Sequence, residues 1–287
     1  MIAGSGLRTI PPSDAAAEGV LVGAGDIAEC PTAGDEETAA VLDAVVEEHP
    51  KAVVFTTGDG AYPDGSYQEY LDCYGPSWGR HKERTRPAVG NHDFKQTKAQ
   101  GYNRYWGDQG GTFDLYYYSY DIGAWHVVVL NSECHRVGCE FDSADGEQLE
   151  WLEADLEASG ARCTVAMWHH PRWSSGRYGN DAEYDGFWEV LYDHGVEIVL
   201  NGHEHLYERF EPMDPEGRVN MVAGIRQFTV GTGGGNLRGF QDIQRNSAAR
   251  GSEHGVLKLV LGRDGYDWEF LPLDGGRFRD SGSASCH

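Results

Sequence analysis

The sequence predicts an α/β fold, and two observations support this prediction. Short runs of β-branched and other apolar residues alternate with amphipathic stretches, which is the pattern of strands joined by helical crossovers. Two further runs lie close enough to form a hairpin, so we expect mixed sheets. No Pro- or Ser-rich linker divides the 287 residues. We therefore expect one domain over residues 1–287, with its core at about residues 18–275 and both ends peripheral.

The N-terminal part of the chain predicts a βαβ unit. Residues 19–25 have the composition of a buried strand. Residues 35–49 place apolar side chains on one face of a helix, which Pro50 ends. The strand at residues 52–57 completes the unit.

The rest of the chain continues this pattern. Residues 114–120 and 124–130 predict the hairpin, and a helix is expected from about Asp145, with Gln148 placed for a capping box. A second βαβ unit follows, and the chain ends in strands separated by Gly-rich turns. These elements are expected as strands at residues 163–168, 196–200, 227–231, 255–261 and 266–271, and a helix at residues 183–194.

The acidic balance of the chain excludes some classes of partner. Lys and Arg number 23 against 46 Asp and Glu, which gives a net charge of −23. Such a surface repels the phosphate backbone of nucleic acids and anionic bilayers. The longest apolar runs, at residues 125–130 and 255–261, have strand length and fall far short of the roughly 20 residues that span a membrane. We expect neither a nucleic acid nor a membrane as partner.

The six cysteines indicate whether the protein is located inside or outside the cytosol. Cys134 and Cys139 are close enough for a tight loop to bridge, and no pair has Cys-x-x-Cys spacing. The even number favours three disulfides and a secreted or extracytoplasmic location. The alternative is six reduced cysteines packed as small apolar residues in a cytosolic protein. Residues after Met1 lack the basic and apolar regions of a signal peptide, so we expect any such segment to be absent from this chain.

Five segments place a side chain that can bind a metal directly after a predicted strand. The carboxyl ends of strands are where α/β sheets place ligands, and glycine allows the sharp turn. The steps from one segment to the next are often 32 to 34 residues, about one βαβ repeat, so the side chains should meet at one edge. A single Gly-Asp is most often only a turn, but five in order indicate a metal site. They are Gly25-Asp26, Gly58-Asp59, Gly90-Asn91-His92-Asp93, Trp168-His169-His170-Pro171 and Gly202-His203-Glu204-His205.

Local geometry limits which histidines can share a metal. In an extended segment, His203 and His205 point to the same side, as shared coordination requires. The neighbours His169 and His170 point apart, so only one can face the metal, and this argument does not choose between them.

A competing motif lies at the first of these segments. Residues 23–28 fit G-x-G-x-x-A, the fingerprint of dinucleotide-binding proteins. In that interpretation Asp26 would point a carboxylate at a pyrophosphate, and the histidines would have no role. We therefore favour the metal site.

The ordered set Gly-Asp, Gly-Asp-x-x-Tyr, Gly-Asn-His-Asp, His-x-Pro and Gly-His-x-His resembles the calcineurin-like metallophosphoesterase superfamily. Tyr62 and the sequence of residues 202–209 resemble its purple acid phosphatase branch. The resemblance implies a single metallophosphoesterase catalytic domain, a four-layer α/β/β/α sandwich of two mixed sheets, with a dinuclear metal centre. It also selects His169 over His170. The implied ligands are Asp26, Asp59, Tyr62 and His205 for the first metal, and Asp59, Asn91, His169 and His203 for the second.

The donor chemistry agrees with this assignment. Asp59 can bridge two ions through its two oxygens. A phenolate from Tyr62 suits Fe(3+), whereas the second set suits Fe(2+), Zn(2+) or Mn(2+). The superfamily often has a histidine at the position of Ala28, and here Tyr62 supplies the missing ligand.

The expected reaction is the hydrolysis of small phosphomonoesters, with release of inorganic phosphate, by in-line attack of a metal-bound hydroxide. His92 follows a ligand directly, so we expect it to stabilise the transition state or protonate the leaving oxygen. Asp93 could orient its ring or be a solvated loop carboxylate. The two metal ions carry a total charge of +5, and Asp26, Asp59 and the tyrosinate carry a total of −3. The site therefore has a local charge of +2, so an acidic chain can still bind a small phosphoester.

Substrate contacts are less defined. Where purple acid phosphatases commonly have another histidine, this chain has Tyr178, a hydrogen-bond donor but a poor acid. Arg172 and Arg177 could bind substrate oxygens. The Gly-rich residues 231–236 lack the Lys of a P-loop and predict a strand exit near the site. Alternatives are a phosphodiesterase, a specialised metabolite phosphatase, and a catalytically silent binding protein of this fold. The sequence predicts no oligomeric state.

Overall fold

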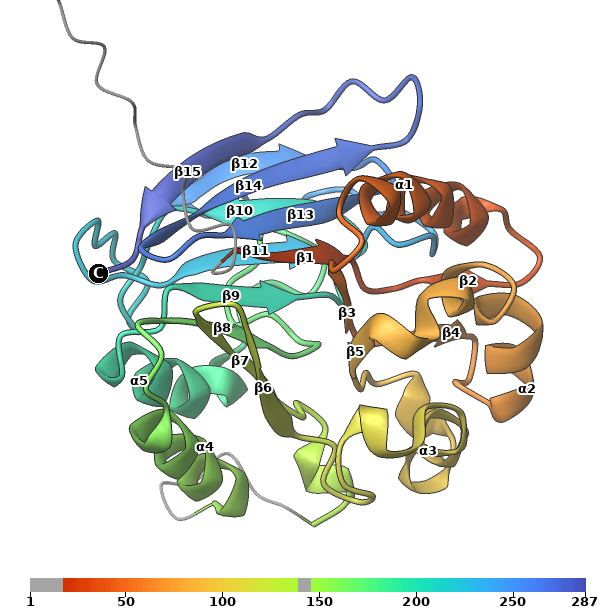
Figure 1. Cartoon of the computed structure of the whole chain (residues 1–287), viewed down its shortest axis with the longest axis horizontal. Coiled ribbons are helices and arrows are strands. Elements are labelled where there is room, and N and C mark those ends of the chain that lie inside the picture. The colour runs from red at the N-terminus through yellow and green to blue at the C-terminus, as the bar shows by residue number, and fades with distance from the viewer. Residues whose placement is uncertain (1–17, 139–145) are drawn as a thin grey trace, which may run out of the picture.

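The computed structural model describes residues 18–138 and 146–287, which form two facing sheets with helices outside them. In Figure 1, α1 to α3 lie on one side of the sheets and α4 and α5 on the other. The predicted α/β fold of two mixed sheets is confirmed.

The first sheet has the strand order β15-β14-β13-β1-β3-β5. Strands β1, β3 and β5 are parallel, whereas β13 joins β1 antiparallel and continues into β14 and β15. Its strands are β1 (Gly19–Gly23), β3 (Val53–Thr57), β5 (Thr85–Ala88), β13 (Gly255–Leu261), β14 (Gly265–Pro272) and β15 (Ser281–Ser285).

The second sheet has the strand order β12-β10-β11-β9-β8-β7-β6. Its centre, from β7 through β8 and β9 to β11, is parallel, and β6 and β7 form the predicted hairpin. Its strands are β6 (Tyr118–Ile122), β7 (Trp125–Val129), β8 (Cys163–Met167), β9 (Ile198–Asn201), β10 (Tyr207–Phe210), β11 (Arg226–Val230) and β12 (Ser247–Gly251). A separate parallel pair is formed by β2 (Ala28–Glu29) and β4 (Ala61–Tyr62).

The helices are short, and in the described part of the chain none is long and apolar enough to cross a membrane. They are α1 (Gly34–Glu48), α2 (Tyr67–Glu69), α3 (Gln100–Trp106), α4 (Glu147–Ala158) and α5 (Asp185–Asp193). Further short helical segments are a π-helical turn at Tyr70–Tyr74 and 3₁₀ segments at Trp78–Arg84, Asp93–Lys95, Thr97–Ala99, Gly107–Gly110, Cys134–Arg136 and Ala182–Tyr184.

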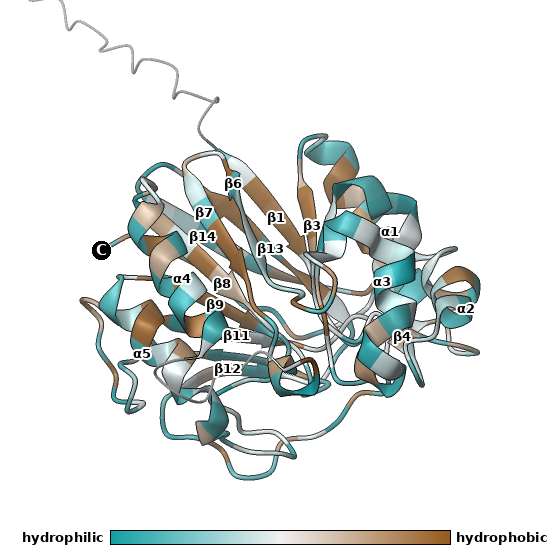
Figure 2. Ribbon diagram, turned by 90° about the horizontal axis from the view of Figure 1, so that it is seen from below, coloured by the Kyte–Doolittle hydropathy of each residue, from teal (hydrophilic) through white to brown (hydrophobic). Residues whose placement is uncertain are grey.

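The alternation of side chains along β8 builds two cores. Val165 and Met167 face the first sheet and join the core between the sheets, whereas Ala166 faces the opposite way. There it packs in a second core that includes Leu152 of α4 and Trp188 of α5. Figure 2 shows the central strands mostly brown and the surrounding helices mixed with teal. The second sheet is therefore apolar on both faces, as parallel central strands require.

Several features differ from the prediction. The capping box at α4 is wrong: the helix has no side-chain cap, and Gln148 instead bonds both main-chain groups of Asn131, at 2.7 and 2.9 Å, where β7 ends. Hydrophobic periodicity predicted neither β15 nor the helical turns between residues 66 and 110. These turns pack through irregularly spaced aromatic rings such as Tyr70 and Tyr105, stacked with centroids 4.8 Å apart.

Two disulfides join distant parts of the chain. Cys30 bonds Cys73, and Cys163 at the start of β8 bonds Cys286 after β15, so the C-terminal strand is tied to the second sheet. The even number of cysteines predicted such bonds. Cys139 lies outside the described residues, so its pairing with Cys134 stays a prediction.

His126 on β7 lies between two carboxylates from other elements. Its Nδ1 contacts Asp121 of β6 and its Nε2 contacts Asp155 of α4, both at 2.8 Å. Because carboxylates only accept, both ring nitrogens carry protons when the two bonds form. The hydrogen bond to Asp155, opposed by burial and helped by Asp121, raises the pKa of His126 above 6.5.

We expect His126→Gln to destabilise the protein by about 2 kcal/mol at pH 6. The pKa of His126 is higher in the folded than in the unfolded protein, so its protonation stabilises the fold. This stabilisation is fully present below the pKa of the unfolded state and is lost as the pH rises through the pKa of the folded state. The loss caused by the substitution should therefore shrink at pH 9. Urea unfolding of both proteins at the two pH values measures it, and an equal loss at both would show that the ring acts only by packing.

Candidate metal centre

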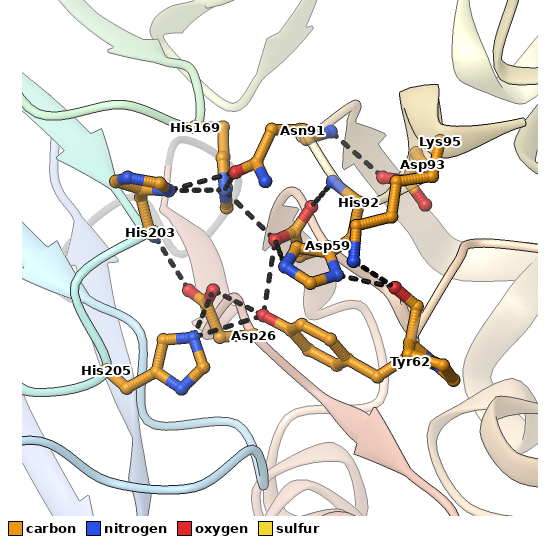
Figure 3. A network of polar contacts seen from close by, with 12 residues as sticks. Asp26, Asp59, Tyr62, Asn91, His92, Asp93, Lys95, His169, His203 and His205 are labelled. Carbon is orange, nitrogen blue, oxygen red and sulfur yellow. Dashed lines mark hydrogen bonds and ion pairs between the residues drawn. The ribbon is translucent and has the colours of Figure 1, made fainter.

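The carboxyl ends of strands from both sheets meet at one edge, and the predicted ligands lie on the loops there. Asp26 follows β1, Asp59 follows β3, and Asn91 follows β5 in the first sheet. His169 follows β8, and the segment from His203 to His205 follows β9 in the second sheet. Figure 3 shows these side chains, together with Tyr62, pointing toward one another.

Four donor atoms form a first group. The Tyr62 hydroxyl lies 2.7 Å from Asp26 Oδ1, 3.2 Å from Asp59 Oδ2 and 3.2 Å from His205 Nε2. His205 Nε2 is also 3.2 Å from Asp26 Oδ1. Atoms this close and aimed at a common point could hold one metal ion.

Four donor atoms form a second group beside the first. His169 Nε2 lies 3.3 Å from Asp59 Oδ2 and 3.1 Å from Asn91 Oδ1. His203 Nδ1 lies 2.9 Å from Asn91 Oδ1 and 3.3 Å from His169 Nε2. This group could hold a second ion.

One atom, Asp59 Oδ2, belongs to both groups. The other oxygen of the carboxylate accepts the main-chain N–H of His92 at 2.7 Å. The sequence predicted a bridge through both oxygens of Asp59, and this detail stays a prediction. In the structure Oδ2 is the oxygen that lies near donor atoms of both groups.

The backbone is strained where it delivers the ligands. Asp26, Asp59 and His203 have φ values of 58°, 51° and 67°, in the left-handed region that side chains other than glycine rarely adopt. Such residues cost about 1–3 kcal/mol each and concentrate at functional sites. Steric crowding explains why glycine occupies positions 58 and 90 beside these ligands. A Cβ on Gly90 would lie 2.3 Å from Asp59 Oδ1, and one on Gly58 would lie 2.6 Å from His169 Nδ1.

Main-chain carbonyls fix the tautomers of two histidines. Nδ1 of His169 donates to Thr57 O at 2.7 Å, and Nδ1 of His205 donates to Asn236 O at 2.8 Å. Each bond keeps the Nδ1 hydrogen on the carbonyl and turns Nε2 toward the cluster, where a metal ion would replace the Nε2 proton. Asn236 lies in the Gly-rich segment, where Gly235 N–H donates to Asp26 O at 2.8 Å. The predicted strand exit near the site is therefore confirmed.

The electrostatics of the cluster favour a cation. Burial alone would raise the pKa of Asp59, but His169 outweighs it, and the pKa of the carboxyl is lowered. The same pair raises the pKa of His169 to about 10, against the effect of burial. Burial, Asp26 and Asp59 raise the pKa of Tyr62 well above 10. Protons on the imidazole and phenol groups thus compensate the charge of the buried carboxylates, and metal ions could take the place of these protons. The carboxylate, phenol, amide and imidazole donors fit two ions.

His92 borders the cluster on one side. Nδ1 of its ring contacts Pro63 O at 2.6 Å, and Nε2 lies 4.0 Å from Asp59 Oδ2. Asp93 does not orient this ring, nor is it solvated: its buried carboxylate accepts Tyr70 Oη–H at 2.6 Å and Gly90 N–H at 2.9 Å. Burial and then Asp59 raise the pKa of Asp93 to about 7. Both predictions for Asp93 are wrong, because the side chain turns inward.

His170 takes no part in either group. Its Nδ1 contacts Ser132 Oγ at 2.8 Å, and its Nε2 lies 3.5 Å from Glu133. Its ring stacks on Tyr184, with centroids 5.7 Å apart. Both ring nitrogens of His170 thus contact residues outside the two donor groups. This agrees with the resemblance, which selects His169 and not His170 as the ligand.

Of the predicted substrate contacts, Tyr178 packs against a residue of the site, whereas Arg172 contacts Asp185 and Trp173. The Tyr178 ring stacks on His203 with centroids 4.6 Å apart, and the residue is 55% exposed. Arg172 forms an ion pair with Asp185 through Nε and lies over the Trp173 ring. Contact of Arg172 with a substrate stays a prediction.

Sequence reasoning missed the role of Glu204. This buried residue lies between the two ligand histidines and points the opposite way, into the loop that carries Tyr178. Its Oε1 accepts Tyr178 N–H at 2.6 Å and Ser174 Oγ–H at 3.4 Å. Glu208 accepts Ser175 N–H at 2.8 Å in the same loop. A buried carboxylate next to two ligands was a possible signal, but burial is not visible in the motif.

The chain matches a known family. Residues 21–207 match the family described as calcineurin-like phosphoesterase. This is more than half of the chain, so the chain belongs to the calcineurin-like phosphoesterase family.

Curated relatives confirm the resemblance to the purple acid phosphatase branch. Purple acid phosphatase 15 of Arabidopsis thaliana is 30% identical over 188 residues, which are 57% of this chain and 34% of the relative. Purple acid phosphatase 22 of the same plant is 28% identical over 231 residues, 68% of this chain and 50% of the relative. The chain thus spans between about a third and a half of the length of these relatives.

Solved structures share the fold. A purple acid phosphatase from yellow lupin (Lupinus luteus) seeds has a TM-score of 0.77 at 18% identity, covering 93% of this chain and 54% of that protein. The Plasmodium protein GAP50, described as the anchor in the inner membrane complex, has a TM-score of 0.69 at 14% identity, covering 94% of this chain and 90% of that protein. At these identities the likeness shows the fold alone.

We expect Glu204→Leu to loosen the loop that carries Tyr178. The substitution leaves the Tyr178 N–H without its acceptor, and a lost bond to a buried carboxylate should open the loop about tenfold more often. Trypsin cleavage after Arg177 measures this opening. Glu204→Gln keeps an acceptor oxygen and should be cleaved more slowly than Glu204→Leu. Glu189→Leu on α5 is the control for lost charge, and an unchanged rate in Glu204→Leu would contradict the role of this carboxylate.

Proposed function

We propose that this chain is a dinuclear metal-dependent phosphatase that hydrolyses small phosphomonoesters. The observation that carries the proposal is Asp59 Oδ2, one buried oxygen common to two four-atom donor groups. Two metal ions held by a shared ligand suit in-line displacement at phosphorus. Membership of the calcineurin-like phosphoesterase family supports the same reaction class.

The donor atoms support an assignment of the metals. Asp26, Tyr62 and His205 with Asp59 would hold Fe(3+), because a phenolate is a hard anionic ligand. Asn91, His169 and His203 with Asp59 would hold Fe(2+), Zn(2+) or Mn(2+). When bound, the ions supply an acidified water and neutralise charge on the phosphoryl group.

His92 is suited to handle a proton at the leaving oxygen. Because the carbonyl of Pro63 only accepts, the Nδ1 that contacts it carries a hydrogen. Nε2 is then the nitrogen that gains or loses a proton. It lies 4.0 Å from Asp59 Oδ2, so it borders the place where a phosphoryl group would bind. A protonated Nε2 would donate to the leaving oxygen.

The net charge of the chain bears on the substrate. At −23 the protein repels extended polyanions such as nucleic acids, whereas a locally positive metal centre can accept one small phosphoester. A phosphodiester is the alternative substrate, and rates on p-nitrophenyl phosphate and bis(p-nitrophenyl) phosphate distinguish the two. The disulfides support a secreted or extracytoplasmic protein.

Removing single ligands should affect the metals unequally. Elemental analysis of protein purified without added metal should find two ions per chain, nearly none in Asp59→Ala, and about one in Asn91→Ala. Tyr62→Phe should abolish a tyrosinate-to-iron band in the visible spectrum. If Asp59→Ala retains one ion at full occupancy, the shared-ligand arrangement is refuted.

Substitution of His92 should separate catalysis from metal binding. We expect His92→Ala to lower kcat on p-nitrophenyl phosphate by about 100-fold or more while metal content stays unchanged. His194→Ala on α5 serves as the control for loss of an imidazole elsewhere. Unchanged turnover in His92→Ala would rule out this role.

A further inference from the structure

Three side chains beside His203 are not used by the two donor groups. The Tyr178 ring stacks on the His203 imidazole at an interplanar angle of 29°. The Arg238 guanidinium lies over the same tyrosine ring, with Cζ 5.4 Å from its centroid, and Arg177 lies 5.7 Å from it. We call Arg177, Tyr178 and Arg238 the arginine rim.

The position of Arg238 is fixed by the ligand segment itself. Its main-chain N–H donates to His205 O at 2.9 Å, and its side-chain NH1 donates to His203 O at 3.3 Å. Its own carbonyl accepts Ser252 Oγ–H at 2.8 Å. The guanidinium is therefore held next to the metal centre and does not extend freely into solvent.

Most N–H donors of this guanidinium have no hydrogen-bond partner in the described part of the chain. Arginine has five N–H donors in a planar fork, and the contact with His203 O takes one. Among residues 18–138 and 146–287, no carboxylate forms an ion pair with Arg238 or Arg177. Arg172 and Arg209, by contrast, are paired with Asp185 and Asp280. Arg238 thus offers a preformed site for an oxyanion, which a guanidinium binds through two parallel hydrogen bonds.

We propose that the arginine rim binds a second oxyanion on the alcohol part of the substrate. The inference rests on the proposed phosphatase function, in which the reacting phosphoryl group lies at the two donor groups. In the described part of the chain Arg238 contacts the His203 carbonyl and the Tyr178 ring but no donor atom of either group. The chain therefore prefers small phosphoesters with a second anionic end over neutral ones.

The test uses two esters that differ only in charge. These are 4-carboxyphenyl phosphate and 4-carbamoylphenyl phosphate, which have nearly the same size and shape. The wild-type protein should show a kcat/KM about tenfold higher for the carboxylate, mainly through KM. Arg238→Gln should lower kcat/KM for the carboxylate about tenfold more than for the amide, which brings this ratio close to one.

Arg162→Gln is the matched control. Arg162 precedes β8, at the end of the strand opposite the metal centre, where it pairs with Asp264. Its loss removes the same charge, so the ratio should stay near the wild-type value. Equal kcat/KM for the two esters in the wild type, or an equal decrease for both in Arg238→Gln, would overturn the proposal.

A binding measurement separates this inference from the proposed reaction. The phosphonates (4-carboxyphenyl)phosphonate and (4-carbamoylphenyl)phosphonate cannot be hydrolysed, so their Kd values, measured by calorimetry on the metal-loaded protein, do not depend on turnover. A tenfold preference for the carboxylate that is lost in Arg238→Gln supports the rim even if neither ester is hydrolysed, in which case only the phosphatase proposal fails. Equal Kd values in the wild type refute the rim whatever the rates.

Discussion

Two carboxylates, Asp26 and Asp59, are buried side by side at the edge where the two sheets meet, and the surrounding structure compensates their charge. Each has one oxygen bound by a main-chain N–H: His203 N–H reaches Asp26 Oδ2 at 2.8 Å, and His92 N–H reaches Asp59 Oδ1 at 2.7 Å. The remaining oxygens face imidazole and phenol groups. An unpaired buried charge costs several kcal/mol, so these loops cannot move independently of the carboxylates.

This constraint also connects the two sheets. Asp26 and Asp59 belong to loops of the first sheet, whereas His169 and His203 belong to loops of the second. The bond from His169 Nδ1 to Thr57 O crosses from one sheet to the other, at the last residue of β3. Packing of the sheets therefore sets the separation of the donor groups, and the left-handed residues that deliver them are held by the cores on both sides.

The α/β pattern and most central strands followed from hydrophobic periodicity, because buried parallel strands give continuous apolar runs. The edge at which the polar side chains meet followed from their position after those strands. What periodicity could not show was Gln148 bonding the end of β7, Asp93 turning inward, or Arg172 pairing with Asp185, since each depends on a contact between distant segments. The same holds for β15, whose residues Ser281–Ser285 include no β-branched residue and one apolar residue, Ala284.

The region around the metal centre divides into two parts that are held differently. The inner donors are fixed by the main chain of the sheets, so a change in any of them would disturb the buried carboxylates. Tyr178 and Arg238 lie on separate loops and are held by Glu204 and by carbonyls of the ligand segment. Among the described residues neither side chain bonds Asp26 or Asp59, so substituting Tyr178 or Arg238 removes none of the bonds to these carboxylates. Physical constraint is therefore weakest where the alcohol part of a substrate would bind, and this is where related chains of the same fold can differ in specificity while retaining the same metal centre.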